Sequence, residues 1–190
     1  MAPVAVLIGP PGAGKTEIGP LLAERLGTRF RDTDADMAAA AGQPVGDIFI
    51  EQGEPAFRQL EREAAARALR EHDGVLALGS GAILDPELQL RLEGLLVVYL
   101  AADFGTIARR LGLDRPRVVI PGNPRGRLRA MLEERRPLYE RLASVTIKTD
   151  DLDPDELAEQ IAAAMNDPAV NDPAVNDPAM NDPASDEQPR

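Results

Sequence analysis

VAVLIGPPGAGKT, residues 4–16, is the stretch that decides the fold. It begins with an apolar run typical of a buried strand and continues as a glycine-rich loop ending in Lys15 and Thr16. With Gly9 and Gly14, these residues match the GxxxxGK[ST] pattern of a phosphate-binding P-loop, and a helical pattern follows. Glycines let backbone N–H groups approach phosphate oxygens, and the next helix adds the positive end of its dipole. We therefore predict a nucleotide phosphate site; the plainer alternative is an ordinary glycine turn.

Polar side chains beside this loop have separable expected roles. Lys15 would reach the β- and γ-phosphates as a point charge, and the Thr16 hydroxyl would ligate Mg²⁺. Asp32 and Asp34 follow in the segment RDTDAD. One carboxylate could hold the metal through water and the other could bind and orient a hydroxyl nucleophile, although helix capping would also explain both. Asp36 belongs to the first turn of the next helix, where acids favour the dipole.

Length and composition limit the class of protein. With 190 residues and 44% hydrophobic content, the chain can build one well-buried α/β domain. It has no cysteine, which excludes disulfides and thiolate metal sites. No apolar run approaches the roughly 18 residues of a membrane span, and the start of the chain lacks the charged segment of a signal peptide. We therefore expect a cytoplasmic protein without membrane contact.

The net charge of −11 originates at the end of the chain. Residues 150–190 hold 12 acids and one base, whereas residues 1–149 hold 20 charges of each sign. The acidic balance therefore describes a tail and not a substrate preference. Residues 109–141 hold ten arginines against four acids, so an anion would be held there unless this is a solvated helix face. Nucleic-acid binding is disfavoured, because aromatic stacking residues are scarce and the acidic tail would compete.

Apolar runs typical of strands alternate with helical patterns along the chain. We expect strands at 4–8, 29–32, 75–78, 95–100 and 145–148. We expect helices at about 15–26, 34–52 with a break at 42–44, 55–72, 86–92, 103–112, 124–142 and 154–165. This alternation predicts an α/β fold whose parallel sheet has helices on both faces. Ligands of such sheets bind at the carboxyl ends of the strands, which selects the P-loop, Asp32 with Asp34, and residues 79–81.

The helix expected at 55–72 has two faces of different character. Phe57 and Leu60 lie on its core face, and Arg58 and Glu61 share another face at a spacing of three residues. Such a pair is usually a surface ion pair worth a few tenths of a kcal/mol, but this one is near the candidate site. We interpret His72, the only histidine, as a solvated capping residue and not a catalyst.

The end of the chain is a separate object. From Asn166 it reads NDPAV, NDPAV, NDPAM, NDPAS, with a proline in every unit. Proline removes a backbone donor and disfavours helix, and one Val or Met per unit cannot make a core, which argues against a solenoid. We predict a disordered, acidic repeat tail over residues 166–190.

These motifs together resemble the shikimate kinase family. They are the P-loop, DTD at 32–34, FRQLE at 57–61, LGSGA at 78–82, Arg109 with Arg110, and RRPLY at 135–139. The resemblance covers residues 1–165 and is far more specific than the P-loop alone. It implies a P-loop kinase with a five-stranded parallel sheet, a substrate-binding segment at 34–62 and a lid at 112–124. It also implies transfer of the ATP γ-phosphate to the 3-hydroxyl of shikimate, in aromatic amino-acid biosynthesis; we expect a monomer.

The resemblance also implies roles for individual residues. Those expected to bind ATP are Gly12, Ala13, Gly14, Lys15, Thr16, Glu17, Arg110, Arg117 and Pro154, with Arg110 and Pro154 flanking the adenine. Those expected to bind shikimate are Asp34 on the hydroxyls, Arg58 and Arg135 on the carboxylate, and Gly79, Ser80 and Gly81. Thr16 and Asp32 would hold Mg²⁺, and catalysis would rest on Lys15, Asp34 and Arg117. The chemistry agrees, because a polyol acid needs guanidinium groups for its carboxylate and a carboxylate for its hydroxyls.

The chain departs from the family pattern at two places. Ser80 stands where the family usually has the middle glycine of three, which affects only a backbone contact. In the lid, LDRPRVVIPGNP, the Arg-Pro step falls at Arg115, while the spacing of the following apolar residues favours Arg117. A lid arginine would neutralise charge on the transferring phosphoryl group.

Three other functions use some of the same features. A gluconate kinase shares the P-loop and the need for a carboxylate clamp, but has a different pattern around Arg58. A nucleotide kinase needs a base-reading site, which the sequence does not reveal. A non-catalytic nucleotide-binding or scaffold protein could use the same loop, with the repeat tail as its interaction element.

Overall fold

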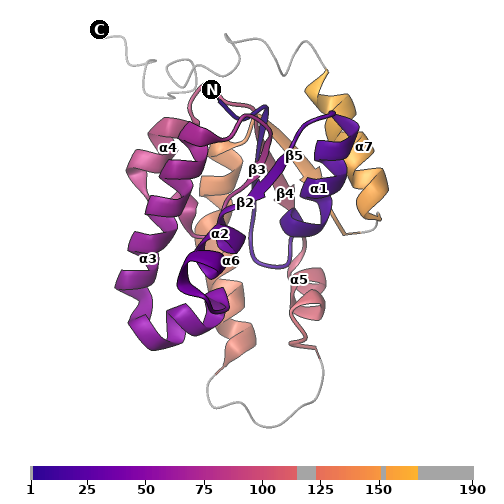
Figure 1. Ribbon diagram of the computed structural model, residues 1–190. Helices are drawn as coiled ribbons and strands as arrows, with labels where there is room; N and C mark the ends of the chain where they lie inside the picture. The colour runs from indigo at the N-terminus through magenta and orange to yellow at the C-terminus, as the bar shows by residue number, and fades with distance from the viewer. Residues whose placement is uncertain (1, 115–122, 151–152, 167–190) are drawn as a thin grey trace, which may run out of the picture.

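Five short apolar strands form one parallel sheet in the middle of the structure (Figure 1). The computed structural model describes residues 2–114, 123–150 and 153–166. In this part of the chain the strands are β1 Ala5–Ile8, β2 Phe30–Asp32, β3 Val75–Ala77, β4 Val97–Ala101 and β5 Val145–Lys148. Their order is β2–β3–β1–β4–β5, so Leu7 of central β1 pairs with Ala77 of β3 and with Val98 of β4. The predicted five-stranded parallel sheet is confirmed.

The helices begin and end close to where the sequence pattern places them. They are α1 Lys15–Arg25, α2 Thr33–Ala41, α3 Val45–Glu71, α4 Pro86–Leu92, α5 Phe104–Arg110, α6 Pro124–Leu142 and α7 Pro154–Met165. A short 3₁₀ helix, η1 Ala82–Leu84, was not predicted. The expected break after α2 is confirmed, and Gly42 ends that helix with φ 68°. A second break divides α3 at Gly53, whose φ of 77° and ψ of 168° are not helical.

Helices cover both faces of the sheet because the buried strands are apolar on both sides. Val6 and Ile8 of β1 join one core with side chains of α3, α4 and α6, while Leu7 joins the other core with side chains of α1 and α7. Figure 1 shows α3, α4 and α6 on one side of the sheet and α1 with α7 on the other. The alternation of a strand therefore divides the core into two layers, as the fold class predicts.

A third, smaller core holds the substrate-binding segment expected at 34–62. Met37 of α2 packs with Ile48, Phe57 and Ala64 of α3. Phe57 also meets the half-exposed ring of Phe49 edge-on, at a centroid distance of 5.3 Å. Because this segment has its own apolar contacts, α2 and the first part of α3 form a distinct lobe beside the P-loop end of the sheet (Figure 1).

The interpretation of His72 as a solvated residue is wrong. Its side chain is buried, and Nε2 lies 3.2 Å from the carbonyl oxygen of Arg29 and 3.0 Å from that of Val75. The reason is that the chain leaves α3 in an extended conformation at His72 and enters β3 at once, which directs the ring toward the adjoining β2. His72 lies at the end of α3 as expected, but its ring joins two strands.

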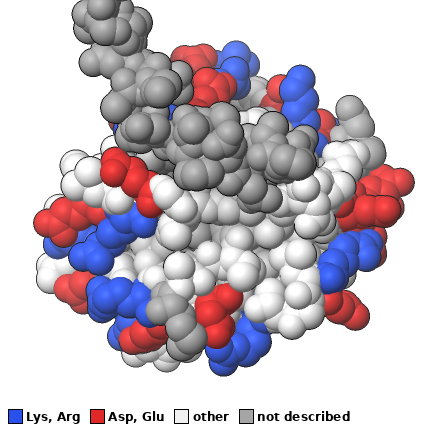
Figure 2. Space-filling model, turned by 90° about the horizontal axis from the view of Figure 1, so that it is seen from above, with Lys and Arg blue, Asp and Glu red and all other residues white. Residues whose placement is uncertain are grey.

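Charged side chains are mixed over the surface. Seen from above, Lys and Arg alternate with Asp and Glu around the rim of the molecule (Figure 2). No helix in the described part of the chain is long and apolar enough to cross a membrane. Asn166 follows α7 as its C-cap, and the rest of the predicted tail lies outside the described residues.

Candidate active site

The P-loop connects β1 to α1, with Gly14 as the N-cap of the helix. Lys15 Nζ donates to the carbonyl oxygens of Gly9, at 2.7 Å, and of Pro10, at 3.2 Å. Burial lowers the pKa of the Lys15 ammonium, while the carboxylates of Asp34, Asp32 and Glu61 oppose that shift. Lys15 is thus a cation set between the phosphate-binding loop and three carboxylates. Of the other loop residues expected to bind ATP, Ala13 is buried and Glu17 is exposed in the first turn of α1.

Asp32, at the carboxyl end of β2, connects the P-loop helix to α2. Its Oδ2 accepts a hydrogen bond from Thr16 Oγ1 at 2.7 Å, and its Oδ1 accepts one from the Asp34 backbone N–H at 2.9 Å. The second bond makes Asp32 the N-cap of α2. From the sequence, helix capping and a place in the phosphate site were alternative explanations for Asp32. In the structure the same carboxylate caps α2 and contacts Thr16.

Asp34 lies in the first turn of α2 among several charges. Burial raises the pKa of its carboxyl to about 6, and the neighbouring carboxylates of Asp32 and Glu61 act in the same direction. Lys15 and Arg58 act in the opposite direction. A carboxylate with this pKa accepts protons far more readily near neutral pH than an ordinary aspartate, as a general base requires.

The turn at residues 79–81, between β3 and η1, is held by side chains from three helices. The Gly79 N–H donates to Thr33 Oγ1 at 2.9 Å, and the Gly81 N–H donates to Glu61 Oε1 at 3.0 Å. The Ser80 carbonyl oxygen accepts from Arg135 Nη1 at 3.2 Å and from the Tyr139 hydroxyl at 2.6 Å. The Gly79 N–H, the Ser80 carbonyl and the Gly81 N–H are therefore each held by a side chain from a different helix.

Close approach explains which positions of this turn are glycine. A Cβ on Gly79 would lie 2.6 Å from both Asp34 Oδ1 and Glu61 Oε1, and one on Gly81 would overlap the Arg58 guanidinium. A side chain at either position would therefore displace the Asp34, Glu61 or Arg58 side chain from its observed place. Ser80 meets no such limit, because its contact with α6 uses the backbone carbonyl.

Arg58 and Glu61 form a partly buried pair, so the surface ion pair that is usual for this spacing is not what the structure contains. Arg58 Nη1 lies 2.7 Å from Glu61 Oε2, and only 4% of the Glu61 side chain is exposed. Arg58 Nη2 also lies 3.2 Å from Glu54 Oε1, and the guanidinium is 5.5 Å from the centre of the Phe57 ring. Glu61 thus directs both Arg58 and Gly81, a role that sequence reasoning did not assign to it.

Arg135 approaches the same turn from α6. It is 9% exposed, and its Nε is buried without a hydrogen-bond partner among the residues that the structure describes. A buried guanidinium N–H without a partner is costly, so this atom is available to an anionic ligand. Arg58 and Arg135 are far apart in the sequence, but both lie beside the 79–81 turn, Arg58 next to Gly81 and Arg135 at the Ser80 carbonyl.

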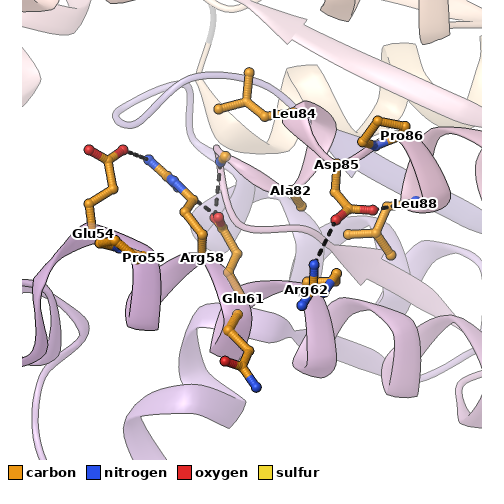
Figure 3. Close-up of a pocket in the computed structure, with 12 residues that line it drawn as sticks. Glu54, Pro55, Arg58, Glu61, Arg62, Ala82, Leu84, Asp85, Pro86 and Leu88 are labelled. Atoms are coloured by element: carbon orange, nitrogen blue, oxygen red, sulfur yellow. Dashed lines mark hydrogen bonds and ion pairs between the residues drawn. The ribbon is translucent and has the colours of Figure 1, made fainter.

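An open cavity of about 570 Å³ lies beside this arrangement, between α3, η1 and α4. Figure 3 shows Arg58 between Glu54 and Glu61, and Arg62 directed at Asp85 across the cavity. Arg58 and Gly81 belong to its lining, whereas Lys15, Asp34 and Arg135 do not. The cavity therefore adjoins the Arg58 side of the site and does not extend to the P-loop.

Arg110 connects three parts of the nucleotide end. It donates to the Gly12 carbonyl at 3.0 Å and to Thr149 Oγ1 at 3.1 Å, so α5 is tied to the P-loop and to the segment after β5. Pro154 is the first residue of α7, a short distance further along that segment. Arg115 and Arg117, of which Arg117 is the expected lid arginine, lie outside the described residues.

Three residues that complete the site were given no role in it by sequence reasoning: Thr33, Glu61 and Tyr139. Each lies inside a quoted motif, DTD, FRQLE or RRPLY, and each acts on a backbone group of the 79–81 turn. The available signal was the position of these polar residues within the motifs. Their partners could not be read because they are backbone atoms of a distant segment.

Comparison with known proteins gives one consistent result. A family model described as shikimate kinase matches residues 11–166. The shikimate kinase of Thermobifida fusca (strain YX) is 54% identical over 160 residues, which cover 84% of this chain and 93% of that protein. The solved shikimate kinase from Acinetobacter baumannii in complex with shikimate has a TM-score of 0.77 and 33% identity, covering 87% of this chain and 93% of that one. A gluconokinase from Sinorhizobium meliloti 1021, at 20% identity and a TM-score of 0.55, covers 86% of this chain and 91% of its own, and shares the fold alone.

Proposed function

The chain belongs to the shikimate kinase family, and from this premise we propose that it transfers the γ-phosphoryl group of ATP to the 3-hydroxyl of shikimate. The products are shikimate 3-phosphate and ADP. The observation that carries the proposal is the grouping of Lys15, Asp34, Arg58 and Arg135 around one turn beside the P-loop. This set supplies a phosphate cation, a hydroxyl acceptor and two guanidinium groups for a carboxylate.

Nucleotide binding begins at the P-loop. The backbone N–H groups of residues 12–17 and the N-terminus of α1 receive the phosphates, and Lys15 Nζ exchanges its loop carbonyls for phosphate oxygens. Arg110, fixed between Gly12 and Thr149, flanks the adenine together with Pro154. Because Arg110 holds α5 against the P-loop, it would keep the adenine site at a fixed distance from the phosphate site.

Mg²⁺ fits the pair formed by Thr16 and Asp32. A hydroxyl and a carboxylate oxygen 2.7 Å apart are the hard ligands that this ion prefers. In the described residues no group of three or more His, Cys, Asp or Glu side chains could hold a metal, so phosphate oxygens and water would complete the coordination. When bound, the ion neutralises charge on the phosphates.

Asp34 receives the proton of the acceptor hydroxyl. As the hydroxyl oxygen bonds to the γ-phosphorus, the bond from that phosphorus to the β-γ bridging oxygen breaks, and the hydroxyl proton moves to the Asp34 carboxylate. Its raised pKa of about 6 suits this transfer near neutral pH. Lys15, whose charge acts on Asp34, stabilises the phosphoryl oxygens on the same side.

Arg58 and Arg135 bind the shikimate carboxylate. Glu61 fixes the direction of Arg58, and the Ser80 carbonyl fixes one end of Arg135, whose Nε has no partner among the described residues and would donate to the carboxylate. Two guanidinium groups that converge on one carboxylate give geometric selectivity as well as affinity. This clamp distinguishes a small hydroxy acid from a nucleoside monophosphate.

Arg117 serves as the lid arginine in this scheme, in preference to Arg115. Lys15 covers one side of the γ-phosphate, and a second cation that arrives with the substrate would cover the other. We expect Arg117→Ala to reduce kcat at least about 10²-fold with little change in KM, and Arg115→Ala to do less. A monomeric state, a cytoplasmic location and the disorder of the tail stay predictions.

An ADP-release assay with three acceptors tests the proposed function. The full chain is incubated with ATP, Mg²⁺ and either shikimate, gluconate or a mixture of nucleoside monophosphates. We expect turnover with shikimate and less than about 1% of that rate with the others. Gluconate is an open chain that does not hold its carboxylate and a hydroxyl at one fixed spacing, and a nucleoside monophosphate has no carboxylate for the clamp. Turnover with gluconate but not shikimate would overturn the proposal, and ATP binding without any turnover would favour a scaffold protein.

A further inference from the structure

The Ser80 carbonyl is an unusual point of contact, because two side chains from one helix share it. Arg135 and Tyr139 are four residues apart on α6, and both donate to this oxygen, at 3.2 and 2.6 Å. A carbonyl oxygen has two lone pairs, so this pair of donors uses its full capacity. The shorter bond belongs to Tyr139, which therefore determines where the carbonyl lies.

Tyr139 itself has little freedom to move. Its side chain is 1% exposed, and its ring stacks on that of Tyr99 from β4, with centroids 5.0 Å apart and planes inclined by 15°. Burial raises the pKa of the Tyr139 hydroxyl well above its ordinary value, so the group remains a hydrogen-bond donor at physiological pH. The Tyr139 hydroxyl is thus a hydrogen-bond donor whose position is fixed by the packing of its ring in the core.

Arg135 depends on that donor for its orientation. If the Tyr139 hydroxyl were absent, the partly buried Ser80 carbonyl would keep only the longer bond to Arg135 Nη1. A carbonyl that has lost its shorter bond leaves the remaining donor free to approach, so the guanidinium would move toward the carbonyl and its Nε would change direction. The Gly81 N–H, one peptide further on, is held separately by Glu61 and would resist the same movement.

We propose that Tyr139 is a positioning residue for the acceptor site: its hydroxyl holds the Ser80 carbonyl and thereby sets the direction in which Arg135 presents its guanidinium to the carboxylate. This inference rests on the proposed function, because it assumes that Arg135 binds the shikimate carboxylate. It adds a residue in the core that contacts neither substrate. The turn 79–81 transmits its effect.

Tyr139→Phe tests the inference, because it removes only the hydroxyl and keeps the stacked ring. Tyr99→Phe is the control: Tyr99 carries the other ring of the same stack, and its hydroxyl makes no hydrogen bond within the described part of the chain. We expect Tyr139→Phe to raise KM for shikimate about tenfold, with KM for ATP within about twofold of the unchanged chain. Tyr99→Phe should leave both values within about twofold.

Equal effects of the two substitutions on KM for shikimate would overturn the inference, since the hydroxyl of Tyr139 would then be merely structural. So would equal rises of KM for both substrates in Tyr139→Phe. Thermal unfolding of each variant, followed by circular dichroism, separates a local change from a loss of folded protein.

A double substitution tests whether the effect passes through Arg135. If it does, Tyr139→Phe should change kcat/KM for shikimate less than about twofold when Arg135→Gln is already present. A full tenfold loss in the double variant would show that Tyr139 acts by another route and would overturn the inference. If Arg135→Gln alone leaves KM for shikimate unchanged, Arg135 is not part of a carboxylate clamp, and both the proposed clamp and the inference fail. If Arg135→Gln raises KM for shikimate but Tyr139→Phe leaves it unchanged, only the inference fails.

Discussion

The phosphate-binding part of the proposed nucleotide site comes from one stretch of chain, residues 9–17, whereas the proposed acceptor site is assembled from α2, α3, α6 and the turn at 79–81. In residues 9–17, backbone N–H groups and one helix terminus would bind the phosphates, and Lys15 would supply the cation. At the proposed acceptor site, side chains would bind the substrate: Arg135 contacts the distant Ser80 carbonyl, and Arg58 pairs with Glu61, which in turn contacts the distant Gly81 N–H. A substitution in residues 9–17 should therefore affect mainly the contacts of the substituted residue. A substitution at the acceptor site should also change the positions of neighbouring side chains.

Lys15→Met should have the largest effect, because Lys15 belongs to the first region and faces the second. We expect kcat to fall by about 10³-fold or more, since the phosphoryl oxygens lose their fixed cation. Lys148→Met is the matched control, as Lys148 is the only other lysine and is exposed at the end of β5. Steady-state assays in which the concentration of ATP or of shikimate is varied would give kcat and both KM values for the two variants. A larger rise in KM for shikimate than in KM for ATP would break the division into two regions.

Asp34→Asn should reduce kcat/KM for shikimate by about 10²-fold, since the amide cannot accept the hydroxyl proton. In the unchanged chain the raised pKa of Asp34, about 6, should give a tenfold loss of kcat/KM per pH unit below that value. Asp36→Asn is the control: Asp36 pairs with Arg31 outside the site and should leave the pH profile unchanged. An acid limb that persists in Asp34→Asn would assign the titration to another group.

The raised pKa of Asp34 should also make the free energy of unfolding depend on pH, and Asp34→Asn should remove that dependence. A folded-state pKa of about 6, above the ordinary 3.8, means that the folded chain binds this proton more tightly than the unfolded chain. The free energy of unfolding should therefore fall as pH rises from about 4 to 6, and the carboxylate should stay destabilising above that range. We expect Asp34→Asn to raise the free energy of unfolding at pH 7.5, by at most about 3 kcal/mol, and not at pH 4. Urea unfolding at both values measures the difference; an equal gain at both would contradict it.

Arg58→Ala should affect the acceptor region alone. We expect KM for shikimate to rise about 10- to 50-fold, the worth of a charge-assisted contact, with KM for ATP unchanged. Arg62→Ala is the control, because Arg62 lines the same cavity one turn further along α3 and pairs with Asp85. A comparable loss of ATP affinity in Arg58→Ala would show that the clamp is misassigned.

Removal of residues 167–190 should have the smallest effect, because the predicted tail belongs to neither region. The cut keeps Asn166, whose side chain donates to the Ala162 carbonyl at the end of α7. We expect turnover to remain normal and the free energy of unfolding to change by less than about 0.5 kcal/mol. A loss of more than about 1 kcal/mol, measured by urea unfolding, would show that the repeat packs on the domain.

The two regions also differ in how far they could be predicted. The P-loop was predictable because its function depends on local spacing: Gly14, Lys15 and Thr16 act where they stand in the chain. Asp32 was harder, because capping and contact with Thr16 were separate explanations until the structure joined them in one carboxylate. His72 was assigned to solvent because its sequence neighbours are polar, and nothing in its own segment indicates that β2 lies beside it.

By itself the sequence determined the order of strands and helices, the phosphate-binding loop and the types of side chain available for a hydroxy acid. These depend on apolar periodicity, glycine placement and residue chemistry, which are local properties. Only the tertiary structure decided that Glu61, Thr33 and Tyr139 hold the turn at 79–81, and that Arg135 lies beside Ser80. The physical reason is that these bonds join side chains to the backbone of segments up to 59 residues away, and such partners exist only once the sheet has formed.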